Sequence, residues 1–148
     1  MTSTLCAPMN ELELWQERLR DLLDDCVGST ALEEADRIRE AARILGAEGG
    51  VACASVNFAR LEQLLEADAP ESAVLSLLGP RVPFMLSRGN GSCLATVLVP
   101  EEGGEVMAEG ATMALALLAA HVSALLAGSE QAHKAIADTG PLASVRLH

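Results

Sequence analysis

The sequence is poor in aromatic residues and in positive charge. Of its 148 residues only Trp15, Phe58 and Phe84 are aromatic, and 10 Lys and Arg stand against 21 Asp and Glu, which gives a formal net charge of -11. A surface this negative repels phosphate backbones and anionic bilayers, and single-strand binders need aromatic side chains on which bases stack. We therefore expect neither nucleic acid nor a membrane among the partners.

The four cysteines lack the close pairs that metal and redox sites use. Cys6, Cys26, Cys53 and Cys93 are spread along the chain, whereas zinc and iron–sulfur sites bring two thiolates to one ion from neighbouring positions. Residues 1–10 have neither the positive start nor the long apolar run of a secretory signal. The sequence thus predicts free thiols, no metal, no cofactor and a cytoplasmic location.

Aliphatic residues arranged with helical periodicity are what the sequence has in abundance. Half of the residues are apolar. They recur every three or four positions, the period of an amphipathic helix, over three segments: 11–27, 30–45 and 58–67. In the second segment Leu32 is expected on the buried face. Pro70 suits the first turn of a further short helix, which Gly79 ends.

The segment from Val82 to Val99 changes to a period of two. Val82, Phe84 and Leu86 alternate with other residues, and a β-branched run follows the turn sequence 88–91, Arg-Gly-Asn-Gly. Asn-Gly and flanking glycines supply the positive φ angles that tight turns require. We predict a β-hairpin over about 82–99. The short apolar stretch 51–56 fits a strand or a helix equally well.

A long, nearly uncharged segment follows the hairpin. A helix is predicted over about 105–127, and between Ala111 and Ala127 it contains no Asp, Glu, Lys or Arg. Gly128 is expected to end it, with a weaker helix from Ser129 to about residue 138. The apolar run is at the lower limit for a membrane span, is rich in alanine and lacks basic flanks. We therefore interpret it as a buried core helix.

These elements define an α+β fold that is mostly α. Residues 11–138 are expected to form one globular domain, preceded by a flexible N-terminus (1–10) and followed by a tail (139–148). A helix that is apolar on all sides must be covered on all sides. Small residues at four-residue spacing, Ala116, Ala120 and Ala124, would let another helix approach closely. We therefore expect a homodimer in which a second copy contributes to this cover.

A small set of residues is the sequence's best candidate for a ligand site. An apolar pocket between the hairpin and the C-terminal helix is expected around Phe84, Met85 and Met113. Arg88, Cys93 and His121 are the other candidate ligand-binding residues. A glycine-rich loop beside an arginine can hold an anion, and an exposed thiol there would be activated. The hairpin turn, however, already accounts for the glycines, and a neutral buried histidine is common in cores. No catalytic residue is assigned.

Three functional hypotheses follow from these features. The favoured one is a non-catalytic protein-interaction or adaptor module, because no acid, base and orienting group converge and apolar helix surface is in excess. The alternative is a small-molecule-binding or sensory domain that uses the apolar pocket. The least favoured is a thiol-dependent enzyme that uses Cys93 or His121.

Overall fold

The computed structural model describes residues 11–47, 56–99 and 104–138. Within these ranges it has five α-helices and a three-stranded antiparallel sheet, which confirms the predicted α+β fold that is mostly α. The predicted flexible N-terminus, the predicted tail and all but Val56 of the undecided stretch 51–56 lie outside the described residues.

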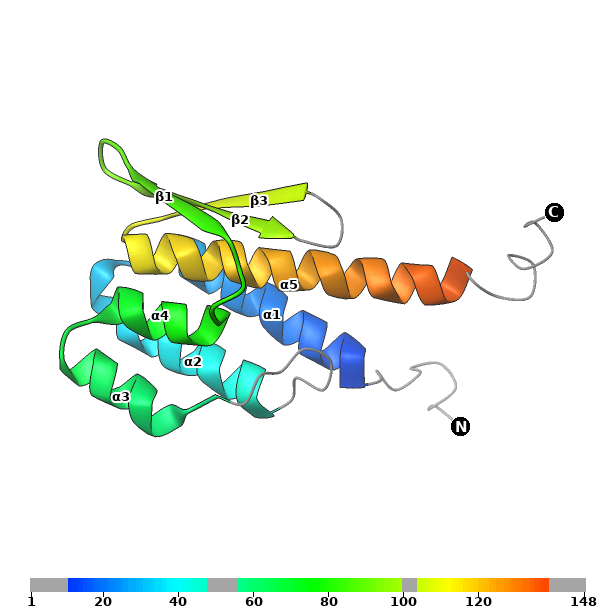
Figure 1. Ribbon diagram of the computed structural model, residues 1–148, viewed down its shortest axis with the longest axis horizontal. Coiled ribbons are helices and arrows are strands. Elements are labelled where there is room, and N and C mark those ends of the chain that lie inside the picture. The colour runs from blue at the N-terminus through cyan, green and yellow to red at the C-terminus, as the bar shows by residue number, and fades with distance from the viewer. Residues whose placement is uncertain (1–10, 48–55, 100–103, 139–148) are drawn as a thin grey trace.

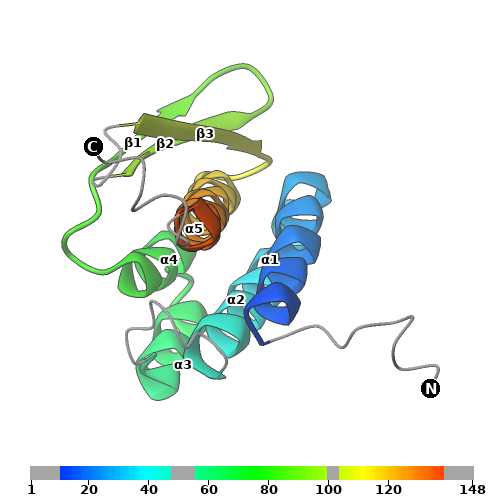
Figure 2. The same ribbon diagram turned by 90° about the vertical axis from the view of Figure 1, so that its right-hand side faces the viewer.

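The elements form layers around the last helix. In chain order they are α1 (Glu11–Gly28), the 3-10 turn η2 (Ala31–Glu33), α2 (Glu34–Ala47), α3 (Phe58–Glu66), α4 (Pro70–Leu78), β1 (Phe84–Arg88), β2 (Cys93–Val99), β3 (Gly104–Gly110) and α5 (Met113–Asp138). The sheet, in the order β1-β2-β3, lies along one side of α5 (Figure 1). The end-on view shows α1 and α4 on the other side of α5, with α2 and α3 beyond them (Figure 2).

Helix α5 is the centre of the hydrophobic core, as predicted. Every residue from Ala114 to Val122 is buried, and most of them, including Leu118, belong to one core cluster with Leu19 and Leu22 of α1 and Val97 of β2. Among the described residues, one segment, Met113–Glu130, has the length and apolarity of a membrane span, and most of it is buried inside the protein. Most of this segment is therefore covered by protein within a single copy of the chain.

The predicted boundaries of the middle of the chain are confirmed. Helix α4 begins at Pro70, and Gly79 ends it with a φ of 84°. The hairpin turn between β1 and β2 contains Gly91 with a φ of 82° and is closed by the Gly89 N–H, which donates to the Ser92 carbonyl at 3.0 Å. Glycine adopts such positive φ angles readily, whereas other residues rarely do.

The prediction of helix over 105–110 is wrong, because this segment is strand β3. Glu, Met and Ala favour helices intrinsically, but here Val106 and Ala108 point toward the core side and alternate with the exposed Glu105, Met107 and Glu109. Pairing with β2 along its whole length outweighs the local preference. The helix begins only at Met113.

The prediction that Gly128 ends the C-terminal helix is also wrong, because α5 continues through it to Asp138. A glycine inside a helix costs about 1 kcal/mol relative to alanine. Contacts with α1 hold the following turn in place: Gln16 Nε2 donates to the buried Ser129 Oγ at 2.7 Å. Arg20 Nη2 pairs with Glu130 Oε2 at 2.6 Å.

Leu32 does not lie on a buried face. It belongs to the 3-10 turn η2 that precedes α2, and its side chain is 94% exposed. The helical period that predicted its burial starts only at Glu34, where the regular α-helix begins. Ile38, on the regular part of the same segment, is fully buried.

Candidate functional site

The sheet has one covered face and one face that no described element covers. On β2, Cys93, Ala95 and Val97 are buried against α5. Because successive side chains in a strand point to opposite faces, Leu94, Thr96 and Leu98 point away from α5. Figure 1 shows no described helix on that side of the sheet. We call this outer surface the open face.

The strand register identifies the other residues of the open face. Met85 of β1 and Met107 of β3 both pair with Thr96 and so flank it. By the same pairing, one residue of β1 and two of β3 complete the face, namely Ser87, Glu105 and Glu109.

Large apolar side chains on the open face are exposed to solvent. Met85 is 67% exposed, Met107 is 58% exposed and Leu98 is 40% exposed. The charged residues of the face are Glu105 and Glu109, which lie on either side of Met107 along β3, and within the three described strands none of its residues is cationic. The open face therefore combines an apolar centre, in which leucine and methionine side chains surround Thr96, with an acidic border along β3.

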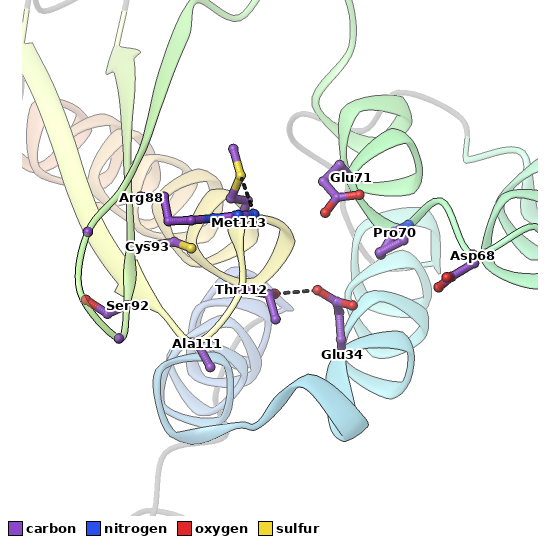
Figure 3. Close-up of a pocket in the computed structure, with 12 residues that line it drawn as sticks. Glu34, Asp68, Pro70, Glu71, Arg88, Ser92, Cys93, Ala111, Thr112 and Met113 are labelled. Carbon is purple, nitrogen blue, oxygen red and sulfur yellow. Dashed lines mark hydrogen bonds between the residues drawn. The ribbon is translucent and has the colours of Figure 1, made fainter.

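A second feature is a polar cleft at the end of the sheet near the hairpin turn. It has a volume of about 510 Å³ and lies between the turn, the start of α5, the start of α2 and the α3–α4 connection. Figure 3 shows Arg88 and Met113 on one side of it and the carboxylates of Glu34, Asp68 and Glu71 on the other. Arg88 Nη2 donates to Met113 Sδ at 3.6 Å.

The Glu34 carboxylate is tied to the first turn of α5. The Thr112 hydroxyl donates to it, and the same hydroxyl oxygen accepts from the Leu115 N–H at 3.1 Å, as an N-cap side chain does. Partial burial raises the pKa of Glu34 above its ordinary value, and the negative charges of Glu71 and Asp68 raise it further, while the Thr112 hydrogen bond opposes the shift.

Asp68 lines the cleft and directly follows the C-terminal cap residue of α3. Among the described residues, Asp68 is the non-glycine residue with a positive φ, 59°, which lies in the left-handed region. The Ala69 N–H donates to the Leu64 carbonyl at 2.9 Å, and the Asp68 N–H donates to the Leu65 carbonyl at 3.1 Å. These two bonds form the Schellman motif that ends α3, in which this position is usually glycine.

The structure brings three of the six predicted ligand residues together and separates the others. Arg88, Cys93 and Met113 line the cleft. Phe84 pairs with Val97 on the covered face of the sheet, and Met85 lies on the open face. His121 lies in the middle of α5, is buried and is not among the residues that line the cleft.

The predicted apolar pocket around Phe84, Met85 and Met113 is therefore not formed as one site. Phe84 and Met85 are neighbours in β1, so their side chains point to opposite faces of the sheet. The cleft that does include Met113 is polar, with three carboxylates and an arginine in its walls.

The nucleophilic and titratable groups of the described core are poorly placed for chemistry. Cys93 is only 5% exposed, and Cys26 is fully buried. Burial raises the pKa of the Cys26 thiol to about 12, and burial lowers the pKa of His121 to about 4. Among the described residues, no group of three or more His, Cys, Asp or Glu side chains is arranged to hold a metal ion.

Sequence reasoning missed four polar side chains of the cleft: Glu34, Asp68, Glu71 and Thr112. The acidic three come from separate segments, so no spacing along the chain indicates that they meet. Thr112 does carry a signal, because a threonine directly before a long apolar run is typical of an N-cap. That signal also marks where α5 begins.

Comparisons with known proteins give no relative: no family model, curated protein or solved structure matches this chain.

Proposed function

We propose that this protein is a non-catalytic protein-interaction module and that the open face of its sheet is the docking surface. The observation that carries the proposal is the pair of exposed methionines, Met85 and Met107, which flank Thr96 at the centre of an uncovered sheet face. Contiguous apolar surface on a sheet is typical of interaction sites, and flexible methionines adapt to a partner's shape.

The composition of β2 supports this proposal. A sheet with one face in solvent normally has strands that alternate apolar and polar residues. Strand β2 reads Cys-Leu-Ala-Thr-Val-Leu-Val, with apolar residues on both faces. Such a run is typical of strands that are covered on both sides. In the described residues α5 covers one side of β2, so its sequence suits a second cover that a partner would supply.

Recovery of partners from cells that express the protein tests the proposal. The bait is the full chain, either unchanged or with Met85→Glu and Met107→Glu, which place two charges on the open face. Leu32→Glu is the matched control, because Leu32 is 94% exposed and lies in the α1–α2 connection, outside the sheet. We expect a partner that the unchanged bait and the control both recover and that the double variant loses.

The proposal fails when the double variant recovers the same proteins as the unchanged bait. Loss of folding does not explain a loss of binding here, since both methionines are mostly exposed and exposed substitutions usually change stability by less than about 0.5 kcal/mol. Circular dichroism and thermal unfolding of each bait check this directly.

The cleft supports a second candidate function, the binding of a small zwitterionic molecule. Within the described residues, Arg88 forms no ion pair with a carboxylate, although Glu34, Asp68 and Glu71 line the same cleft. A ligand with both a cationic and an anionic group would satisfy the two walls at once. Arginine binds carboxylates well because its planar fork donates two parallel hydrogen bonds.

Calorimetric titration with free amino acids tests this second candidate. Saturable heat with an amino acid, lost in both Arg88→Gln and Glu71→Gln, is the expected result. The same heat and affinity for the unchanged protein and for both variants would contradict it.

The homodimer stays a prediction. Its rationale was the need to cover α5, and in the structure one copy buries every residue from Ala114 to Val122. Light scattering at micromolar concentration measures whether a second copy is present.

A further inference from the structure

The open face is suited to one particular kind of partner. We propose that its occupant is a single amphipathic α-helix of another protein, with Lys or Arg residues along one flank. This inference rests on the proposed function and adds to it the chemistry and shape of the partner. Three properties of the face carry it: its dimensions, its apolar centre and its acidic border.

The dimensions of the sheet match one helix. Strands lie about 4.8 Å apart, so the three strands span roughly 10 Å from β1 to β3, and seven residues of β2 extend about 23 Å. A helix with its side chains is about 10–12 Å wide, and about 15 residues of helix extend 23 Å. On the covered face one helix, α5, likewise lies lengthwise along the sheet, and α1 adds contacts with β3 (Figures 1 and 2).

The apolar centre offers contacts along the helix axis and beside it. Leu94 and Leu98 lie two residues before and after Thr96 on the central strand, while Met85 and Met107 lie across from it on the edge strands. A helix over β2 would therefore place a stripe of apolar side chains, spaced at three and four residues, on the leucines and between the methionines.

The acidic border lies on one side of that path. Glu105 and Glu109 are on β3, and four residues of strand separate them by about 13 Å. Positions seven residues apart on a helix lie on the same side and are about 10.5 Å apart, so two Lys or Arg side chains at such positions would reach both carboxylates. The border lies along one flank only, so it also favours one orientation of the helix.

Charge favours a cationic partner over a second copy of the chain. Each copy has a formal net charge of -11, and like-charged proteins repel as they approach. The open face itself contributes two carboxylates and, within the described strands, no cation. A helix with positive charge is attracted both by the whole molecule and by the border of the face.

Methionine methyl groups provide the test, because the chain places them on different surfaces. Met85 and Met107 are on the open face, and Met113 lines the cleft. The probe is a 16-residue helical peptide of Leu and Ala with Lys residues seven positions apart on one flank, and the control peptide has Glu in place of Lys. NMR spectra of the full chain labelled with methyl-13C methionine, assigned by Met→Leu substitutions, follow the titration.

We expect the Lys peptide to shift the Met85 and Met107 signals saturably, with Met113 unchanged and the Glu peptide without effect. The double variant Glu105→Gln, Glu109→Gln should weaken binding about 3-fold to 10-fold, as expected for two exposed ion pairs. Met107→Ser should weaken it about 10-fold through lost apolar contact. Leu32→Ser, which lies in the exposed α1–α2 connection and outside the sheet, should leave the affinity unchanged.

Several results would overturn the helix proposal: equal binding of the two peptides, a shift of Met113 in place of the open-face signals, or no weakening in the Glu105→Gln, Glu109→Gln variant. Signals of Met85 and Met107 that change with protein concentration alone would also overturn it, because a second copy would then occupy the face. The proposed function fails separately, when the double methionine variant recovers the same cellular proteins as the unchanged bait.

Discussion

The close approach of β3 to α5 gives the sharpest prediction, the effect of Gly110→Ala. A Cβ atom added to Gly110 would lie 2.6 Å from the Ala116 nitrogen and 2.9 Å from the Leu115 carbonyl carbon. Ordinary non-bonded contacts are about 3.5–4.0 Å, so the strand and the helix would have to separate by roughly 1 Å. Both clashing atoms belong to the backbone, so no side chain can rotate away.

The first turn of α5 is held in place by its cap, which limits relaxation. The Ala116 N–H donates to the Thr112 carbonyl at 2.9 Å, and the Leu115 N–H donates to the Thr112 hydroxyl at 3.1 Å. Overpacking of cores costs about 1–3 kcal/mol, and we expect the upper end, about 3 kcal/mol. For a chain of this length that corresponds to a Tm lower by about 6–12 °C.

Urea unfolding followed by the fluorescence of Trp15 measures this loss, because Trp15 is the single tryptophan and is buried on α1. Gly104→Ala is the matched control at the other end of β3, since a Cβ there meets no atom within 4 Å. Removing a glycine from an unstrained position stabilises by about 0.4–1 kcal/mol. Equal stability of the two variants would refute the close approach of β3 to α5.

Three further predictions concern the core. Burial lowers the pKa of His121 from 6.5 to about 4. Between pH 6.5 and 4 the folded protein therefore binds fewer protons than the unfolded chain, so the free energy of unfolding falls as the pH drops through that window. The unchanged protein should lose about 2–3 kcal/mol more of this free energy between pH 7 and 4.5 than His121→Leu, as measured by urea unfolding. Leu118 is fully buried, and Leu118→Asp should unfold the protein, because an unpaired buried charge costs several kcal/mol; a soluble variant with an unchanged Tm would contradict this. Cys93 is nearly buried, so it should alkylate more slowly than a free small thiol at neutral pH; faster alkylation would restore the thiol-enzyme hypothesis.

The parts of the fold that the sequence predicts correctly are those with local signals. Helix α4 is framed by Pro70 and Gly79, and both residues act through their own backbone angles. Strand β3 is not predictable from its own residues, because read alone they prefer helix and only pairing with β2 makes them extended. The continuation of α5 through Gly128 is likewise not predictable locally, because the contact between Gln16 and Ser129 joins residues far apart in the sequence.

The candidate sites show the same limit. The alternation of Val82, Phe84 and Leu86 predicts that these residues share a face, but it does not show that the outer face of the sheet lacks a cover. The cleft depends on three helical segments and a hairpin turn that meet only in the folded chain. The sequence identified Arg88 and Cys93 because they stand beside the turn glycines, whereas the carboxylates opposite them, such as Glu71, have no such neighbours.

Asp68 joins the questions of stability and function, because the position it occupies is better suited to glycine. Its left-handed conformation, with a φ of 59°, costs about 1–2 kcal/mol in a residue with a Cβ. Glycine avoids that cost but loses about 0.5–1 kcal/mol through the greater freedom of the unfolded chain. Asp68→Gly also removes one of the negative charges that raise the pKa of Glu34. We therefore expect Asp68→Gly to stabilise the protein by about 0.5–1 kcal/mol.

Asp68→Ala separates the two effects, because alanine removes the charge and keeps the left-handed strain. Urea unfolding should rank Asp68→Gly above Asp68→Ala by about 1 kcal/mol. If the cleft binds the cationic group of a ligand, both variants should bind it more weakly, although one of them is the more stable protein. That combination would show that the carboxylate serves binding at the expense of stability, as residues of functional sites often do. An Asp68→Gly variant that is less stable than the unchanged protein would instead show that the carboxylate stabilises the α3–α4 connection itself.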